Sequence, residues 1–229
     1  MTSSKTKLAL FDLDHTLLPI DSDYAWGVFT TDIGWTDPHV FRQKNDEFFA
    51  HYQAGTLDIH DYVRFATEAL RRRGAVEAAA AQARFMREVI EPALRPQALA
   101  LVREHQARGE TVAIVTATNE FVTRPIAKAF GVEELIAVEL ERDASGWITG
   151  EIRGTPSFRD GKVERVTQWL QAKGQEWSDV DLSFYSDSMN DLPLLERAER
   201  PVATNPDPRL RALALARGWR ILNLFDAED

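Results

Sequence analysis

Apolar and polar positions follow two different patterns along the chain, and these patterns divide it into regions. Short apolar runs, which are typical of buried strands, occur at 8–11, 111–116, 135–138, 182–185, 201–204 and 219–222. Segments with helical spacing precede or separate the later runs, at 96–108, 120–130, 162–173, 192–198 and 208–217. Strands that alternate with helices in this way predict a parallel, doubly wound α/β sheet.

The region over 21–91, between the first apolar run and the helical segment at 96–108, shows no alternating strand pattern. Four segments with helical spacing lie there, at 24–29, 38–52, 58–70 and 76–90. Gly55 and Gly74 follow two of them, where C-terminal helix caps belong. We therefore expect an all-helical insertion over 21–91, within an α/β core formed by 1–20 and 92–229. Farther on, Asp143-Ala-Ser-Gly146 lies between two short strand patterns and predicts a hairpin.

Composition narrows the classes of function. The chain has 229 residues with 36 acidic and 27 basic side chains, a net charge of −9, and no cysteine. An acidic balance argues against general binding of nucleic acid or anionic membranes. The lack of cysteine excludes disulfides, thiolate metal sites and cysteine nucleophiles. No hydrophobic signal core and no membrane-length apolar run is present, so we expect a cytoplasmic protein.

The first apolar run ends at two aspartates, Asp12 and Asp14. The carboxyl end of a buried parallel strand is where open α/β sheets bind ligands. Two crowded carboxylates usually share a proton or bind a cation, and Mg²⁺ prefers oxygen ligands. A carboxylate can also act as a nucleophile toward a phosphoryl group. The structural alternative is a strand end with solvated acids.

Three later positions carry further candidate chemistry. Thr116 ends an apolar run, and the segment from Ala117 onward opens a helix whose free amides can hold a phosphate oxygen. Lys162 opens another helix and can neutralise a phosphate. Asp187 and Asp191 follow the apolar run 182–185 and can complete a metal site. The structural alternatives are a helix cap, a surface lysine and a helix start with favourable acidic charge.

Taken in order, these motifs resemble those of the haloacid dehalogenase superfamily, mostly magnesium-dependent phosphatases. The features on which the resemblance rests are Asp-x-Asp-x-Thr, a threonine after a strand, a lysine, and Asp-x-x-x-Asp. A helical insertion directly after the first motif is also a feature of subfamily IB, which this chain resembles and which includes phosphoserine phosphatases. The resemblance implies a Rossmann-like doubly wound core with a C1-type helical cap. The sequence at 11–26 and 115–123 resembles that of a bacterial branch of this subfamily, which contains histidinol-phosphatases.

The resemblance also implies a role for each matching residue. Asp12 attacks phosphorus, and Asp14 protonates the leaving alkoxide and then activates water. Mg²⁺ is held by Asp12, by the backbone carbonyl of Asp14 and by Asp187. The residues expected to hold the phosphoryl group, or to support the lysine and the metal, are Thr116, Ala117, Lys162, Asn190 and Asp191.

The expected partner is a small phosphorylated metabolite, bound under the helical cap. Asp21 and Asp23 can face the cleft and bind a cationic group of the substrate, although helix capping explains them equally well. Phosphoserine also needs a cation for its carboxylate, and neither Arg42 nor Arg64 lies in a matching motif. Histidinol phosphate has no carboxylate and is the best candidate, with phosphoserine as the alternative. A phosphotransferase, a non-catalytic binding protein, and a monomer or a homodimer all stay open.

Overall fold

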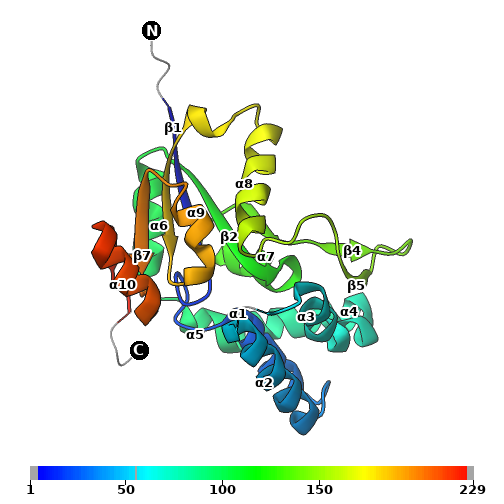
Figure 1. Cartoon of the computed structure of the whole chain (residues 1–229). Helices are drawn as coiled ribbons and strands as arrows, with labels where there is room; N and C mark the ends of the chain where they lie inside the picture. Colours follow the sequence, from blue (N-terminus) through cyan, green and yellow to red (C-terminus); the bar gives the residue numbers. More distant parts are fainter. Residues whose placement is uncertain (1–4, 55, 226–229) are drawn as a thin grey trace.

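The computed structural model describes residues 5–54 and 56–225, and a six-stranded sheet lies at its centre (Figure 1). Its strands are β1 (Thr6–Phe11), β2 (Thr111–Asn119), β3 (Glu134–Val138), β6 (Val180–Ser186), β7 (Arg200–Thr204) and β8 (Arg220–Leu222). Their order is β3-β2-β1-β6-β7-β8, and these neighbours all pair in parallel. The strand order reverses beside β1, as in doubly wound Rossmann-like sheets.

Helices cover both faces of this sheet. They are α6 (Pro96–Ala107), α7 (Glu120–Ala129), α8 (Asp160–Ala172), α9 (Leu192–Leu195) and α10 (Pro208–Arg217). Successive residues of a strand point to opposite faces. Phe11 of β1 therefore packs in the same core cluster as Val102 of α6, whereas Leu10 packs in the cluster of Val166 of α8. Burial on both faces explains why the central strands are continuous apolar runs.

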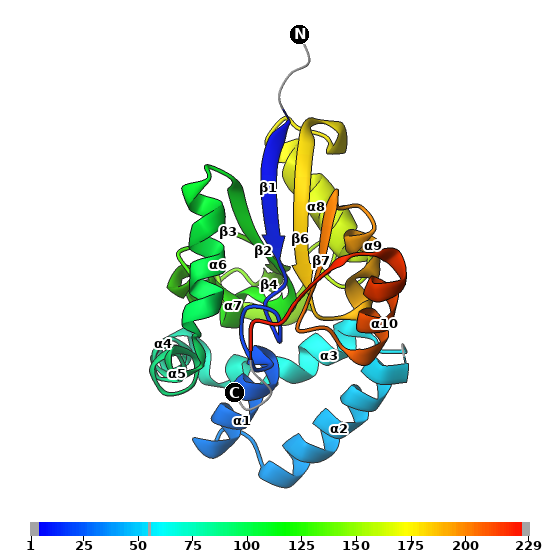
Figure 2. The ribbon, with the colours of Figure 1, turned by 90° about the vertical axis from the view of Figure 1, so that its left-hand side faces the viewer.

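A second group of helices follows β1 and lies beyond the carboxyl ends of the central strands (Figure 2). It consists of α1 (Ser22–Asp32), α2 (Pro38–Ala54), α3 (Ile59–Ala66), α4 (Glu68–Phe85), the π-helical turn η1 (Met86–Ile90) and α5 (Glu91–Ala93). The ring centroid of Trp26 lies 5.2 Å from that of Phe85 and 5.8 Å from that of Phe29. Aromatic burial thus holds α1 against α4.

A hairpin of the α/β core also contacts these helices. Its strands are β4 (Leu140–Arg142) and β5 (Ile148–Ile152), which pair antiparallel. The guanidinium of Arg64 in α3 donates to both carboxylate oxygens of Glu151 at 2.8 and 2.9 Å. Trp147 Nε1 donates to the carbonyl of Arg71 in α4 at 3.4 Å. The hairpin therefore connects the core to α3 and α4 by hydrogen bonds.

The predicted fold class, a doubly wound parallel sheet with a helical insertion after the first strand, is confirmed. Some bounds differ from the prediction. β2 extends three residues past Thr116 to Asn119, and the helix expected over 192–198 ends at Leu195. Gly74 interrupts α4 with φ +77°, a conformation that suits glycine, whereas Gly55 lies outside the described residues. Among the helices described, none is long and apolar enough to cross a membrane.

Candidate active site

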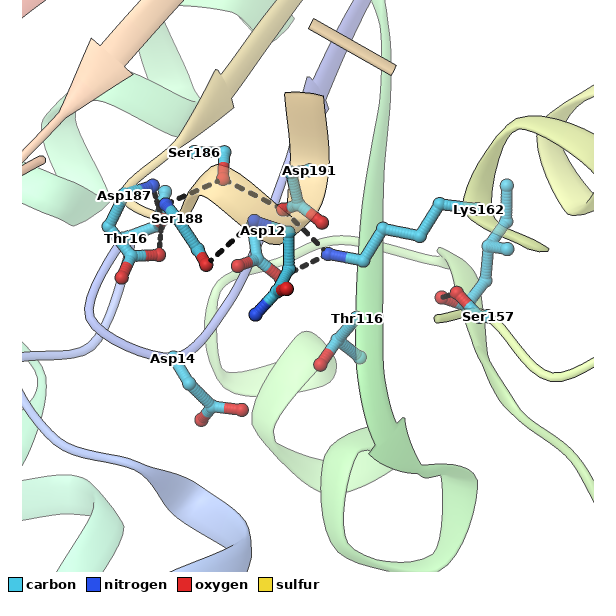
Figure 3. Close-up of polar contacts among 12 residues, drawn as sticks. Asp12, Asp14, Thr16, Thr116, Ser157, Lys162, Ser186, Asp187, Ser188 and Asp191 are labelled. Carbon is cyan, nitrogen blue, oxygen red and sulfur yellow. Dashed lines mark hydrogen bonds and ion pairs between the residues drawn. The ribbon is translucent and has the colours of Figure 1, made fainter. Parts of the chain in front are cut away.

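Carboxylates from two neighbouring strands meet at one edge of the sheet (Figure 3). Asp12 directly follows β1, and Asp187 directly follows β6. The parallel register aligns Phe11 with Tyr185, and the amide of Asp12 donates to the Tyr185 carbonyl at 2.9 Å. Because the two strands end at the same level, both carboxylates lie at the edge where such sheets bind ligands.

Lys162, at the start of α8, is a buried cation of this site. It is 2% exposed, and its Nζ donates to Asp12 Oδ1 at 2.9 Å and to Asp191 Oδ2 at 2.8 Å. Burial disfavours the charged ammonium, but the charges of the two carboxylates outweigh burial and raise the Lys162 pKa. Ser186 Oγ donates to the same Asp191 oxygen at 2.7 Å. Asp191 thereby orients the lysine toward Asp12.

The site carries more negative than positive charge. Burial raises the pKa of Asp12 to about 6, although Lys162 partly opposes this shift. Burial, together with the charges of Asp12 and Asp191, raises the pKa of Asp187 well above its usual range. Asp12, Asp187 and Asp191 thus lie close to the Lys162 ammonium, and the raised pKa values of Asp12 and Asp187 reflect the cost of ionising these carboxyls together in a buried space. A divalent cation is the natural neutralising partner for such a site.

The donor groups at this edge of the sheet are oxygen atoms, the ligand type that Mg²⁺ prefers. Throughout the described parts of the chain, no three His, Cys, Asp or Glu side chains gather into a metal-binding group. Mg²⁺ usually keeps several waters and binds one or two carboxylates. Asp12 and Asp187, with the expected carbonyl of Asp14, fit this preference.

Thr16 contributes a contact that sequence reasoning did not assign. Its hydroxyl donates to Asp187 Oδ1 at 3.0 Å, and the amide of Asp187 donates back to that hydroxyl at 3.0 Å. Thr16 is fully buried, on a turn in which its own amide bonds to Leu13. This reciprocal pair fixes Asp187 relative to the loop after β1. The signal was present in Asp-x-Asp-x-Thr, whose threonine was left without a role.

Asp14 lies past the strand end, apart from the network around Lys162 (Figure 3). Its Oδ1 accepts from the amide of Ser22 at 2.7 Å, and its Oδ2 accepts from Thr118 Oγ1 at 2.9 Å. Burial, with the nearby charge of Asp21, raises the pKa of Asp14 to about 8. A carboxyl that keeps its proton near neutral pH can act as a general acid. Thr118 is a second contact that the sequence did not reveal.

The predicted phosphate-binding residues line one cleft with the carboxylates. The cleft has a volume of about 1210 Å³, and Thr116, Ala117, Lys162 and Asn190 all lie in its wall. Thr116 does not cap a helix: it is buried within β2, and Asn119 caps α7 instead. The structure thus brings together all four positions that were expected to surround the phosphoryl group.

Asp21 and Asp23 also line the cleft, but their environments differ. Asp21 caps α1 by accepting from the amides of Asp23 and Tyr24, at 3.0 and 2.9 Å. Asp23 is buried, and its carboxylate accepts hydrogen bonds from the Tyr62 hydroxyl and from Asn119 Nδ2, the latter at 3.4 Å. Burial and the charge of Asp21 raise the Asp23 pKa to about 7. Nothing in the local sequence pointed to Tyr62, which reaches Asp23 from a different helix.

Comparison with known proteins identifies the family of this chain and several similar proteins. The haloacid dehalogenase-like hydrolase model matches residues 9–196. A histidinol-phosphatase of Neisseria meningitidis is 40% identical over 217 residues, covering 94% of this chain and 98% of that protein. A crystal structure of a Bordetella pertussis protein of unknown function has a TM-score of 0.92 and 50% identity, over 97% of this chain and 100% of that one.

More distant structures share the fold. A substrate-bound phosphoserine phosphatase has a TM-score of 0.66 at 19% identity, covering 96% of this chain and 94% of that chain. The order of the motifs along this sequence, the strand ends on which they lie and the family match over most of the chain lead to one assignment. The protein belongs to the haloacid dehalogenase-like hydrolase family.

Proposed function

We propose that the protein is a magnesium-dependent phosphomonoesterase that forms an aspartyl phosphate on Asp12. The family and its similar relatives make it a phosphoric monoester hydrolase. The observation that carries the finer proposal is the position of Lys162, whose ammonium bonds to both Asp12 and Asp191. A carboxylate beside a fixed cation, at the end of a parallel sheet, suits attack on a phosphoryl group.

The chemistry assigns separate tasks to the first two aspartates. Asp12 forms the new bond to phosphorus while the bond from phosphorus to the leaving alkoxide breaks, and Asp14 gives its proton to that alkoxide. Asp14 then takes a proton from water, which attacks the aspartyl phosphate and releases phosphate from Asp12. The raised pKa of Asp14, about 8, supports its first task because the carboxyl holds a proton at neutral pH.

Binding of the phosphoryl group rests on the surrounding residues. Asp12, Asp187 and the backbone carbonyl of Asp14 would hold Mg²⁺, which supplies neutralisation of charge on the phosphoryl oxygens. The groups that would hold those oxygens are the Thr116 hydroxyl, the Ala117 amide, the Lys162 ammonium and the Asn190 side chain. Asp191 keeps Lys162 in place. We propose that 21–91 acts as a cap over this core, 1–20 and 92–229.

Histidinol phosphate is the substrate that we favour. The relative named histidinol-phosphatase is 40% identical over nearly the whole chain, and buried Asp23 suits the protonated amine of such a substrate. Phosphoserine, the alternative, also needs a cation for its carboxylate. Among the described residues that line the cleft, the arginine is Arg84, and its Nε already donates to Glu88 Oε1 at 2.7 Å. Arg42 is exposed, and Arg64 pairs with Glu151.

Release of inorganic phosphate tests this proposal directly. We expect magnesium-dependent turnover of histidinol phosphate, with kcat/KM at least about tenfold above that for phosphoserine, a difference of about 1.4 kcal/mol. Asp12→Asn should lower kcat by at least about a thousandfold, with an unchanged circular dichroism spectrum.

Three results contradict parts of the proposal. Full activity of Asp12→Asn excludes the aspartyl phosphate, and a preference for phosphoserine excludes the favoured substrate. Phosphate transfer to an added alcohol that outpaces transfer to water indicates a phosphotransferase instead. An aryl phosphate serves as the control for basic phosphatase chemistry.

A further inference from the structure

A short turn after β7, residues 205–207, contacts three separate parts of the chain near the site. Asn205 and Asp207 provide the contacts. They reach the loop after β1 (13–18), the loop after β6 (187–189) and the C-terminal segment 223–225. The turn therefore joins the two loops that bear the proposed metal ligands, and neither the motifs nor the mechanism above uses it.

Asn205 uses both ends of its side-chain amide. Its Nδ2 donates to the carbonyl of His15 at 2.9 Å and to that of Thr16 at 3.3 Å. Its Oδ1 accepts from the amides of Leu224 and Phe225 at 2.6 and 3.3 Å. The backbone of Asn205 has φ +46°, a left-handed conformation that asparagine tolerates better than most residues. The residue type thus satisfies the backbone and both sets of contacts.

Asp207 contacts the loop after β6. Its amide donates to the Asp187 carbonyl at 2.9 Å, and its Oδ2 accepts from the Met189 amide at 3.3 Å. Its Oδ1 accepts from the Leu210 amide at 2.7 Å, so the same side chain caps α10. Asp187 is consequently held by the Asp207 backbone on one side and by the Thr16 hydroxyl on the other.

These contacts form a closed path around Asp187. Asn205 holds the carbonyl of Thr16, the Thr16 hydroxyl bonds to the Asp187 carboxylate, and Asp207 bonds to the Asp187 carbonyl. We propose that the 205–207 turn is a positioning element that sets Asp187 relative to Asp12 and so sets the affinity for Mg²⁺. This inference rests on the proposed magnesium-dependent function. Asn205 and Asp207 act through other residues and touch no reacting atom.

Two substitutions at Asn205 separate its two sets of contacts. Asn205→Asp keeps an acceptor for Leu224 and Phe225 and suits the left-handed backbone, but an ionised carboxylate cannot donate to His15 and Thr16. Asn205→Gly removes all the side-chain contacts at no steric cost to the backbone. Asn223→Asp is the matched control, since Asn223 is exposed and accepts from Arg211.

Direct titration of the metal-free protein with MgCl₂ by calorimetry is the first measurement. We expect both Asn205 variants to raise the Kd for Mg²⁺ at least about fivefold, because two hydrogen bonds to the loop are lost. Saturating Mg²⁺ should restore kcat with an aryl phosphate to within about threefold of wild type. Hydrogen exchange provides a readout without metal: amides 16–18 should exchange faster in both variants and not in Asn223→Asp.

The outcomes separate this inference from the proposed function. Wild-type Mg²⁺ affinity and exchange in Asn205→Asp, in a protein that binds Mg²⁺ and releases phosphate normally, overturn the inference alone. An effect confined to Asn205→Gly also overturns it, because the C-terminal contacts would then matter instead of those to the loop. If the wild-type protein binds no Mg²⁺ and releases no phosphate, the proposed function fails first.

Discussion

Asp23 is a buried carboxyl with no cation in the contacts described for it, and such a group makes stability depend on pH. Its pKa in the folded protein is about 7, raised by burial and by Asp21, whereas an unfolded chain keeps the usual value of 3.8. Below about pH 4 the carboxyl is protonated in both states. Between about pH 4 and pH 7 the unfolded chain releases this proton while the folded protein retains it, so stability falls as pH rises.

Replacing Asp23 with Asn removes this dependence. Relative to wild type, the free energy of unfolding of the variant should increase by about 2–4 kcal/mol between pH 4 and pH 8. Denaturant titrations in the presence of a chelator measure this difference, and comparing two pH values cancels the hydrogen bonds that the variant loses at both. Asp46→Asn, on an exposed part of α2, is the control. Parallel pH curves for wild type and Asp23→Asn would contradict the burial argument.

The acidic residues of the site differ in how well the sequence predicts their roles. Asp12 and Asp187 could be predicted because each ends an apolar strand, and parallel strands align their carboxyl ends. Asp21 and Asp23 could not be told apart from the sequence, because both lie at the start of a predicted helix, where acidic residues suit either helix capping or substrate binding. Only the fold buries Asp23 against Tyr62 and leaves Asp21 to cap α1.

The position of Lys162 depends on the start of α8, because this residue lies in the first turn of that helix. Gly161 precedes Lys162, and a Cβ built on Gly161 would clash with the carbonyl oxygen of Pro156. Because that neighbour is backbone, the helix start has to move to admit a side chain. Gly161→Ala should therefore lower the free energy of unfolding by about 2–3 kcal/mol and lower kcat at least about tenfold.

Asp160→Ala is the matched control for this prediction. Asp160 lies in the same helical turn and is exposed, so its loss should cost about 0.5 kcal/mol through the helix dipole. Chemical denaturation and phosphate release from an aryl ester measure both effects. Wild-type stability and kcat in Gly161→Ala would mean that the segment carrying Pro156 yields freely and that α8 does not depend on this close approach.

Across the whole molecule, the β4–β5 hairpin is a polar connection between the core and the helices after β1. The Arg64–Glu151 pair is half-exposed on both sides, so its net contribution to stability should be under about 1 kcal/mol. Its position nevertheless ties α3 to the core beside the cleft. Glu151→Ala should raise KM for the phosphate ester about two- to fivefold, with unfolding free energy and kcat little changed.

Glu141→Ala on the same hairpin tests whether the position of Glu151 matters. Glu141 accepts a hydrogen bond from Thr149 within the hairpin, so its replacement should leave KM as in wild type. Raising the salt concentration should move wild-type KM toward that of Glu151→Ala, because exposed ion pairs are screened. Equal KM values for Glu151→Ala and wild type at low salt would show that this pair does not influence the cap.

The class of fold and the centre of the site follow from the pattern of apolar and polar residues. Apolar runs that alternate with helical spacing dictate a parallel sheet, and polar residues after those runs must then lie at one edge. The contacts between distant segments depend instead on how the elements pack in three dimensions. Hydrogen bonds join Thr16 to Asp187, Tyr62 to Asp23, and Asn205 to Thr16. Such pairs have no local signature, because burial and hydrogen bonding between distant segments exist only after the elements have packed.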